Sequence, residues 1–348
     1  GGGALPPLPF AVAQLILELA CPTDVVLARF AFSCRVPICT ALAVQARPTA
    51  RSPPHLRPLS SSSLRSLALV PPLLPPRARS THPPRRPTQV LALKDLRLTS
   101  ESAEVVGWLM RQNRRLEIVD LTDNPIGARG AACVARALPQ SAVRQLLLSG
   151  TSLCDTGGTD QSGLLALARG VALAPALQTL ELRDNQIGAR ACSLVGLRAL
   201  AAALKGKSCT VTKVDLSHNP LQSRGATVLA SVILDSPTLL DLRLDGCRLT
   251  GDWGLTLDGV RAIACALALN TALEHLSLAA NAVGRRSSEA VDQWKHTPCA
   301  ALFLASALER NATLLSCNLR ANHCVGSQAE ALLSAWAKAE REPAKLQL

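Results

Sequence analysis

From about residue 90 onward, the chain repeats one pattern of apolar and polar positions. An apolar residue is followed by others three and five positions later, by Asn or Cys at the eighth position and by a further apolar residue at the tenth. Full copies begin at Leu116, Leu177, Val211, Leu239 and Leu273, and weaker copies begin at Val143 and Leu314. Because the full copies follow one another in order, each trailed by a helical pattern, the chain is a repeat protein and the match is not a coincidence.

A single copy predicts a strand, a turn and a helix. Leu180, Glu181 and Leu182 alternate as in a short strand that turns its leucines inward and Glu181 outward. Asn185 ends the strand, where its amide is expected to satisfy backbone groups of the turn that the next layer leaves unpaired. The spacing of Ala and Leu over residues 191–204 predicts a helix with an apolar stripe. One repeat cannot bury that stripe alone, so the repeats must stack into a solenoid.

The position that ends each strand is polar or a thiol throughout. In six copies it is Asn or Cys, at Asn124, Asn185, Asn219, Cys247, Asn281 and Asn322. The copies starting at 116, 143, 177, 211, 239, 273 and 314 are separated by steps of 27, 34, 34, 28, 34 and 41 residues. The short steps fit one strand, one turn and one helix, and the longer steps contain insertions such as 154–163 and 285–298.

These strand patterns resemble the leucine-rich repeats of the ribonuclease-inhibitor subfamily, together with the helix starts IGARGAACVARAL at 126–138, IGARACSLVGLRAL at 187–200 and LQSRGATVLASVIL at 221–234. The resemblance covers residues 90–340. It implies an α/β horseshoe of about seven to eight strand-turn-helix repeats, with short parallel strands on the concave face and helices on the convex face. It says little about function, because this scaffold carries many unrelated activities.

The residues before the repeats differ in composition. Residues 46–88 are rich in Pro, Ser and Arg, which predicts a disordered linker. Residues 1–45 form a short apolar, helical segment in this interpretation, and residues 89–348 form the repeat domain with a C-terminal capping helix. Leu8-Pro9, Ile16-Leu17, Cys21-Pro22-Thr23-Asp24-Val25-Val26 and Cys34-Arg35 resemble an F-box, which implies docking of residues 8–35 onto the adaptor subunit of a cullin-type ubiquitin ligase. A plain apolar helix is the alternative.

The charge and the aromatic content argue against nucleic acid as the partner. The formal net charge is +12, but residues 1–88 carry ten arginines against two acids, whereas residues 89–348 carry 27 basic against 23 acidic residues. Aromatic residues make up 2% of the chain, and 46–88 contains none for stacking on bases. No uncharged run is long enough to cross a membrane, which makes a membrane role unexpected.

Candidate chemistry along the chain is sparse. No Cys or His pair has zinc-site spacing, and no His has a partner four residues on. Gly206-Lys207-Ser208 lacks the first glycine of a phosphate-binding loop, and Asp215, Ser217 and His218 share one predicted strand. We therefore expect no catalytic, cofactor or metal site, and no enzyme. Cysteines such as Cys133 fall among Ala and Leu on predicted helices, which favours free thiols and a cytoplasmic location, with the nucleus left open.

The outward strand positions are the most informative about function. Over the clear repeats they contain nine acidic residues against five basic ones, although the repeat region as a whole is positive. The predicted partner-binding residues are Asp120, Asp123, Glu181, Arg183, Asp184, Asp215, Arg243, Asp245 and Glu274. Asp120, Glu181 and Asp215 should occupy equivalent positions, with Leu147 between the first and second of them. An acidic face favours a basic protein partner. A merely solvated face is the alternative.

The sequence thus predicts a non-enzymatic protein-binding module that uses its concave strand face and inserted loops. Two other functions stay open. One is an F-box substrate adaptor of a ubiquitin ligase. The other is a GTPase-activating protein similar to the activators of the Ran cycle, although the mixed-charge end EREPAKLQL differs from their acidic C-terminal extension.

Overall fold

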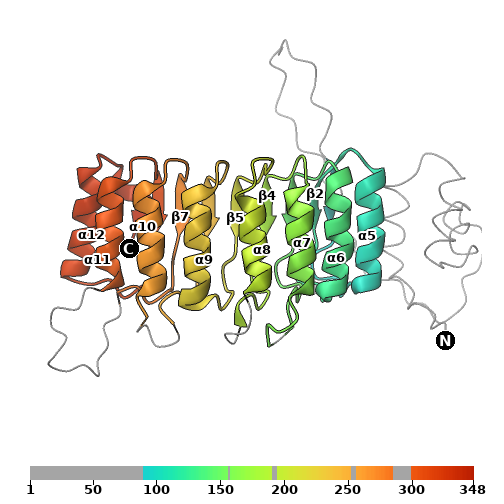
Figure 1. Cartoon of the computed structure of the whole chain (residues 1–348), viewed down its shortest axis with the longest axis horizontal. Helices are drawn as coiled ribbons and strands as arrows, with labels where there is room; N and C mark the ends of the chain where they lie inside the picture. The colour runs from blue at the N-terminus through green and yellow to red at the C-terminus, as the bar shows by residue number, and fades with distance from the viewer. Residues whose placement is uncertain (1–88, 156, 190–193, 252–255, 285–298) are drawn as a thin grey trace, which may run out of the picture.

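The structure is a computed structural model that describes residues 89–155, 157–189, 194–251, 256–284 and 299–348 (Figure 1). The strands are β1 Gln89–Ala92, β2 Leu116–Asp120, β3 Gln145–Leu147, β4 Thr179–Glu181, β5 Lys213–Asp215, β6 Asp241–Arg243, β7 His275–Ser277, β8 Ser316–Asn318 and β9 Leu346–Gln347. The helices are α5 Ser100–Gln112, α6 Gly127–Ala137, α7 Ser162–Ala172, α8 Val195–Leu204, α9 Gln222–Asp235, α10 Asp258–Leu269, α11 Ala300–Arg310 and α12 Ser327–Lys338, with short 3-10 turns at Leu138–Gln140 and Pro343–Lys345. The F-box-like segment and the proline-rich linker lie outside the described residues.

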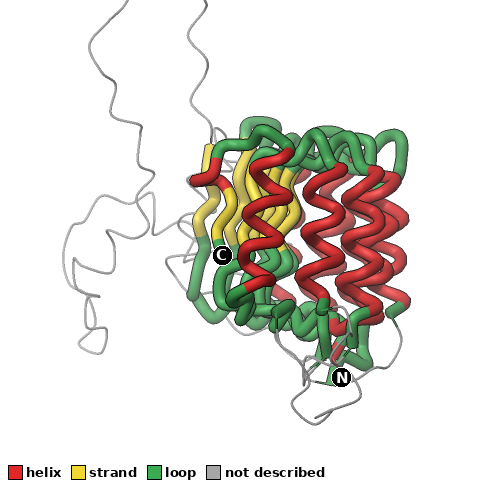
Figure 2. The backbone as a smooth tube through the Cα atoms, turned by 90° about the vertical axis from the view of Figure 1, so that its left-hand side faces the viewer, coloured by secondary structure: helices red, strands yellow, loops and turns green. Residues whose placement is uncertain are grey.

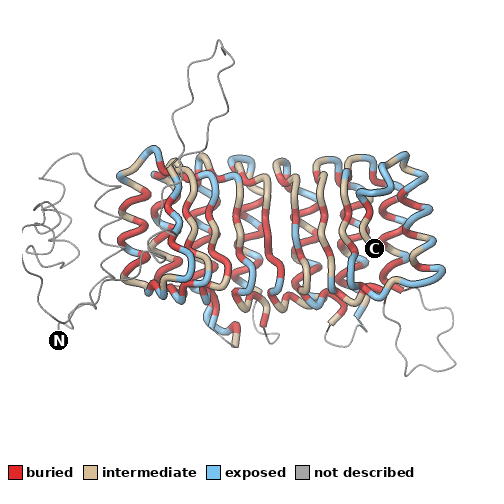
Figure 3. Tube along the Cα trace, turned by 180° about the vertical axis from the view of Figure 1, so that it is seen from behind, coloured by how far each residue is buried: buried red, intermediate tan, exposed pale blue. Residues whose placement is uncertain are grey.

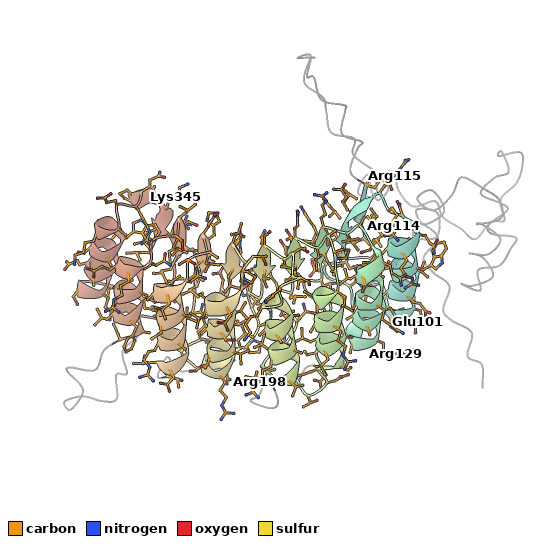
Figure 4. The ribbon with its side chains drawn as sticks, turned by 45° about the horizontal axis from the view of Figure 1, so that its top comes forward. Glu101, Arg114, Arg115, Arg129, Arg198 and Lys345 are labelled. Carbon is orange, nitrogen blue, oxygen red and sulfur yellow. The ribbon has the colours of Figure 1, made fainter. Side chains whose placement is uncertain are left out.

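The strands form one parallel sheet in which each strand pairs with the next along the chain. Figure 2 shows the strands as one layer and the helices as another, and Figure 4 shows the row of repeats curving with the strands on the inner side. This is the leucine-rich-repeat solenoid that the sequence predicts. Among the described residues, no helix has the length and apolar character needed to span a membrane.

The inward side of the sheet carries the core in the predicted register. Leu180 pairs with Leu146 on one side and Val214 on the other, and all three are fully buried. Leu182 and Leu216 are fully buried as well. Buried residues recur along the whole row of repeats (Figure 3) and form one core cluster, so each repeat covers the apolar surface of its neighbours.

Small residues at the helix starts let the helices pack closely. A Cβ added to Gly163 of α7 would lie 2.7 Å from the Cα of Ala128, and one added to Gly259 of α10 would lie 2.7 Å from the Cα of Ser223. Both distances are too short for real atoms, so these positions require glycine at this helix spacing. Of the predicted helix at 191–204, residues 195–204 form α8, and residues 191–193 lie outside the described part of the chain.

The asparagines that end the strands form a ladder between repeats. Asn185 accepts hydrogen bonds at Oδ1 from the backbone N–H groups of Thr151 and Leu153, both at 3.1 Å, and its Nδ2 donates to Leu148 O at 2.7 Å. These groups belong to the preceding repeat. The expected role of the amide is therefore confirmed, but the groups it satisfies lie one layer earlier along the chain. Asn185 is fully buried, so the ladder replaces water at these backbone groups.

In the short repeats, a backbone N–H group of the turn is satisfied by a carbonyl group of the same turn. In the repeat of β2, Ile126 N–H donates to Asn124 O at 2.7 Å, and α6 begins immediately at Gly127. Gly127, with a φ of +66°, donates its N–H to Thr151 O. Ile126 N–H, one of the two backbone donors that an asparagine at 151 would serve by analogy with Asn185, is thus already used, which fits the presence of Thr there.

The repeat of β5 has the same arrangement. Leu221 N–H donates to Asn219 O at 2.7 Å, α9 begins at Gln222, and Gln222 N–H donates to Cys247 O. These two repeats are the ones that precede the 27- and 28-residue steps. The length of the turn therefore explains why the next ladder residue is Thr or Cys in place of Asn.

The last described segment adds a strand that the sequence pattern does not predict. After α12, β9 pairs in parallel with β8. Trp336 of α12 is buried and donates its Nε1–H to Glu342 O at 2.9 Å. The guanidinium carbon of Arg341 lies 4.7 Å from the centre of the Trp336 ring. Arg341 donates to Leu308 O at 2.7 Å, which ties this segment to α11.

Candidate functional site

Outward-facing side chains of the strands line up in columns across the sheet. The strand register aligns Asp120 with Leu147, Leu147 with Glu181, and Glu181 with Asp215. Arg243 follows Asp215 in the same column. The predicted alignment of the three acids, with Leu147 interrupting it, is confirmed. We call the surface formed by the outward side chains of β1–β9 the strand face.

The strand face is hollowed over its first strands. This groove has a volume of about 500 Å³ and is open to solvent. It is lined by Lys94, Asp120, Thr122, Asp123, Leu147, Ser149, Gly150, Glu181, Arg183, Asp184 and His218. The lining carries four acidic side chains against two lysine or arginine side chains. The labelled Arg114 and Arg115 lie at one end of the row of repeats and Lys345 at the other (Figure 4).

The groove contains five of the nine predicted partner-binding residues. They are Asp120, Asp123, Glu181, Arg183 and Asp184. The other four, Asp215, Arg243, Asp245 and Glu274, lie outside its lining. The structure therefore concentrates the predicted residues of β2 and β4 and separates them from those of the later strands.

Several charges of the groove are neutralised within the chain. Lys94 Nζ lies 3.6 Å from Asp123 Oδ2, and Glu181 Oε1 lies 3.4 Å from the Nζ of Lys213 on the next strand. These side chains are partly exposed, so each pair contributes little to stability. Asp120 and Asp184 have no ion pair among the described residues. Their carboxylates are the uncompensated negative charges of the groove.

Asp215 differs from its expected role as an exposed contact. Only 3% of the residue is exposed, and its Oδ1 accepts a hydrogen bond from Ser217 N–H at 2.9 Å. Arg183 Nη1 lies 3.8 Å from its Oδ2 and partly neutralises it. Outward alternation alone cannot reveal this burial, because it fixes the side of the sheet on which a residue lies and not how far its neighbours cover it. Asp215 therefore has a structural role beside Arg183, and its part in partner binding stays a prediction.

On the later strands, two of the predicted contact residues form hydrogen bonds with other side chains of the chain. Arg243 binds Asp241 through two hydrogen bonds of 3.3 and 3.2 Å. Partial burial works to lower the pKa of Arg243, but these bonds and the charges of Asp241, Asp215 and Asp245 raise it above its usual range. Asp245 Oδ1 accepts from Ser277 Oγ at 2.5 Å. Arg243 and Asp245, predicted as contacts, are thus engaged within the chain.

Glu274 lies just before β7, where its carbonyl accepts hydrogen bonds from Leu315 N–H and Ser316 N–H. Glu274 comes one residue before His275, the first residue of β7, whose neighbour on β6 is Asp241. Glu274 therefore sits apart from the groove, at the start of its strand.

Sequence reasoning did not single out Lys94, Ser149 and Gly150 of the groove. Gly150 has a φ of +63°, and a Cβ there would lie 2.6 Å from Asp123 Oδ1, so the aspartate closes over a position that only glycine fills. Ser149 follows Leu147 by two positions, and the strand alternation could have identified it as a second outward residue. Among the described residues, no group of three or more His, Cys, Asp or Glu side chains is placed to hold a metal.

The ladder residue Cys247 has a different chemical character from the asparagines. It is fully buried, and its Sγ lies 3.3 Å from Leu216 O. Burial raises the pKa of the Cys247 thiol to about 12. The thiol therefore stays protonated and acts as a weak hydrogen-bond donor in the ladder.

Comparison with known proteins agrees with this architecture. A family model described as leucine-rich repeat matches residues 112–135 and 207–230. These two segments contain β2 with most of α6, and β5 with most of α9, which are the two short repeats. The chain is a leucine-rich-repeat protein.

Among curated proteins, the chain is similar to ribonuclease inhibitor. It is 26% identical to the pig (Sus scrofa) inhibitor over 268 residues, which cover 68% of this chain and 53% of the inhibitor. It is 24% identical to the mouse (Mus musculus) inhibitor over 267 residues, with the same coverage. The chain thus spans about half the length of these relatives. Among solved structures, actin-binding site 2 of leiomodin-1 aligns at a TM-score of 0.36 and 15% identity, covering 51% of this chain and 88% of that one.

Proposed function

We propose that this chain is a non-enzymatic binding module that holds a protein partner on its strand face. The observation that supports this function is the open groove over β2–β4, where four acidic side chains face two basic ones. The helix side of the sheet is covered, so the strand face is where strand-borne side chains meet solvent. The excess of carboxylates favours a partner with a basic surface.

The size of the face suits a protein partner better than a small molecule. A specific protein contact buries on the order of 1,600 Å² in total, more than the groove alone supplies. The remaining contact would come from the rest of the strand face and from the inserted loops, which is the mode of binding the sequence predicts. The groove would then be the acidic centre of a larger interface.

The names of the curated relatives suggest the first probe. Two of them are called ribonuclease inhibitors, so a ribonuclease with a basic surface is the first protein to test. The inhibitory activity of those longer proteins is not transferred as a whole, because this chain spans about half of their length.

The test is capture by the full chain from cell extract, followed by quantitative mass spectrometry, with the ribonuclease measured separately by biolayer interferometry. The test variant combines Asp120→Lys and Asp184→Lys, which reverse the two uncompensated charges. Glu104→Lys is the matched control, because Glu104 is an exposed acid on α5 of the helix layer. We expect the control to retain the basic partners of the wild type and the test variant to lose them.

Salt sharpens this test. Binding by the wild type should weaken as the salt concentration rises through about 0.15 M, where charges more than about 8 Å apart are largely screened. If the folded double variant and the wild type capture the same proteins at every salt concentration, the strand face is not the binding surface.

Two alternatives are tested by separate experiments. An F-box adaptor would co-purify with the ligase adaptor subunit and lose it when residues 8–35 are deleted; those residues lie outside the described part, so this stays a prediction. A GTPase activator would accelerate GTP hydrolysis by a small GTPase. We also propose a cytoplasmic location, with the nucleus as the alternative, because the eight described cysteines are all free thiols.

A further inference from the structure

The edge of the solenoid where helices end and strands begin differs in charge between its two halves. We call the residues from the last turn of each helix to the start of the next strand the helix-end rim. Between α5 and β5 the rim has eight Lys or Arg and no Asp or Glu, over 109–115, 134–144, 169–178 and 201–212. Between α9 and β9 it has four basic and five acidic residues, over 232–240, 266–274, 307–315 and 335–345.

Most of the basic side chains on the first half of the rim are exposed and have no acidic partner. The exposed ones are Arg114, Arg115, Arg136, Arg144, Arg169 and Lys207. Arg144 lies 3.6 Å from Glu117, and the other five have no ion pair among the described residues. Their positive charge is therefore available to a partner.

Helix stability explains only part of this charge. A basic residue in the last turn of a helix interacts favourably with the helix dipole, a role that fits Arg111, Arg136 and Arg169. Arg114 and Arg115 lie beyond the end of α5, in the turn before β2. The later helices have the same dipole, but their part of the rim is mixed in charge. The positive first half is thus not a requirement of the fold.

The same rim exposes large apolar side chains. Leu173 follows α7 and is 68% exposed, and Leu269, the last residue of α10, is 71% exposed. Leu234 near the end of α9 and Leu315 just before β8 are 46% and 55% exposed. Each of the four belongs to a different repeat, so they are spread along the rim. Exposed leucines beside basic residues suit a partner that offers both negative charge and an apolar interior.

The rim is level from repeat to repeat. The first residues of β3 to β8 pair with one another in register, beginning with Gln145 and Thr179 and ending with His275 and Ser316. Figure 1 shows the helices side by side with their ends in a row. The row curves with the sheet on its inner side, so it bends about an axis along the strands and leaves the rim close to one plane (Figure 4). A flat surface can therefore touch many repeats at once.

The opposite edge, where strands end and helices begin, lacks this excess of positive charge. Over the first four repeats the described residues of its turns have three Lys or Arg and five Asp, at 93–99, 121–126, 148–161 and 182–189. Figure 4 shows Arg114, Arg115 and Lys345 on one edge of the row. Arg129 and Arg198, which belong to helix starts, lie on the other edge. The positive charge of the first half is thus concentrated on one edge.

We propose that the helix-end rim docks edge-on against the surface of a membrane that contains anionic lipids. Its basic side chains contact the headgroups, where each Lys or Arg strengthens binding by about fivefold. Its exposed leucines enter the boundary between headgroups and acyl chains. An acidic protein would use the charges, but only a flat surface contacts the basic and the apolar parts of the rim together. The sequence expectation of no membrane role rested on the lack of a spanning run, which surface binding does not need.

The experiment is co-sedimentation of the full chain with vesicles, which gives a partition coefficient at a salt concentration of about 0.15 M. The vesicles contain phosphatidylcholine mixed with phosphatidylserine, or phosphatidylcholine alone. The test variant combines Arg114→Gln, Arg115→Gln and Arg169→Gln. We expect it to bind the phosphatidylserine vesicles about 100-fold more weakly than the wild type, the product of three fivefold losses. Circular dichroism checks that each variant is folded.

The matched control removes the same charge from the other edge. It combines Arg129→Gln, Arg198→Gln and Arg224→Gln, three exposed arginines near the starts of α6, α8 and α9. These residues lie about 10 Å or more along the helix from the rim. That distance exceeds the screening length of about 8 Å at this salt concentration, so binding should weaken by less than about threefold.

A second pair of variants tests the apolar contact. Leu269→Ala should weaken binding to the phosphatidylserine vesicles by about fivefold, because fewer methylene groups leave water on docking. Leu302→Ala is its control, because Leu302 is an exposed leucine near the start of α11, towards the other edge. We expect the control to bind as the wild type does.

The outcomes separate the membrane from other partners. Equal weakening by the two arginine triples, or none by either, would overturn the proposal, because binding would then come from charge elsewhere, such as the ten arginines before residue 89. Equal binding by Leu269→Ala and Leu302→Ala would rule out the apolar contact and the edge-on docking with it. If the wild type binds polyglutamate through the rim arginines but does not bind the vesicles, the rim recognises an acidic protein and the membrane proposal is wrong. The protein capture proposed for the strand face does not use the rim, so either proposal can fail alone.

Discussion

The two sides of the same strands follow different rules. On the inward side Leu146, Leu180 and Val214 are alike: each is a fully buried aliphatic residue, in three successive layers. On the outward side Leu147 and Glu181, one position further on, differ in charge and in their partners, since Glu181 pairs with Lys213. Stacking forces the inward side to repeat because every layer must cover the next. The outward side does not have to cover a neighbouring layer, so its residues can vary from repeat to repeat. A proposed binding function would therefore depend on the outward residues.

The largest difference in stability should appear between alanine substitutions at two adjacent positions, one on the inward side and one on the outward side. Leu182→Ala removes a fully buried side chain and should lower the free energy of unfolding by about 2–5 kcal/mol through lost transfer energy and the cavity left behind. Glu181→Ala, one residue earlier, removes a partly exposed ion pair and should cost less than about 1 kcal/mol. Chemical denaturation of both variants measures the difference, and equal losses would contradict the strand register.

The ladder at the ends of the strands should come next. Asn219→Ala leaves buried backbone groups without partners, namely the N–H groups of Asn185 and Ile187 and the carbonyl of Leu182. We expect a loss of about 2–3 kcal/mol, since each buried orphan costs on the order of 1 kcal/mol or more.

Cys247→Ala is the matched comparison, because Cys247 occupies the equivalent position after the short repeat. Its thiol is a weak hydrogen-bonding group and the preceding turn is already satisfied by Asn219 O, so the loss should be about 1 kcal/mol. Equal destabilisation by the two variants, again measured by denaturation, would refute the link between turn length and the ladder residue.

The inward side and the ladder could be predicted from the sequence because both depend on spacing alone. A leucine at the third and fifth positions must face the core once the repeats stack, and Asn185 is fixed by the same count. The strand β9 escaped prediction because a two-residue strand has no periodicity to detect. The predicted helix at 191–204 is confirmed over 195–204, where α8 lies.

The outward side could be predicted only in part. Spacing placed Asp120, Glu181 and Asp215 in one column, which the register confirms. It could not reveal that Asp215 is buried while Asp120 is half-exposed, because the two residues occupy the same outward position and spacing does not give the surroundings of each one. For the same reason, the groove and the free hydroxyl of Ser149 become visible only in three dimensions.

The difference in burial between Asp120 and Asp215 should produce a smaller difference in stability. Asp120 and Asp215 each accept a hydrogen bond of 2.9 Å from the backbone N–H two residues later. Asn substitution preserves this acceptor in both. Asp215→Asn also loses the charge that faces Arg183 in a buried setting, so we expect a loss of about 1 kcal/mol. Asp120→Asn should change stability by less than about 0.5 kcal/mol, as surface substitutions usually do. Thermal unfolding at neutral pH compares the pair, and a larger loss at Asp120 would reverse our assignment of the structural aspartate.

The smallest effect on stability should come from the hydroxyl on the groove floor. Thr151, two residues after Ser149 along the chain, is fully buried and donates its Oγ1–H to Leu148 O at 2.7 Å. Thr151→Ala should therefore cost about 1–2 kcal/mol, from a lost hydrogen bond and a lost methyl group. Ser149 Oγ has no partner among the described residues, so Ser149→Ala removes an unsatisfied group and should leave the free energy of unfolding unchanged or slightly higher. A loss above about 1 kcal/mol at Ser149 would mean that its hydroxyl has a hydrogen-bond partner in the protein.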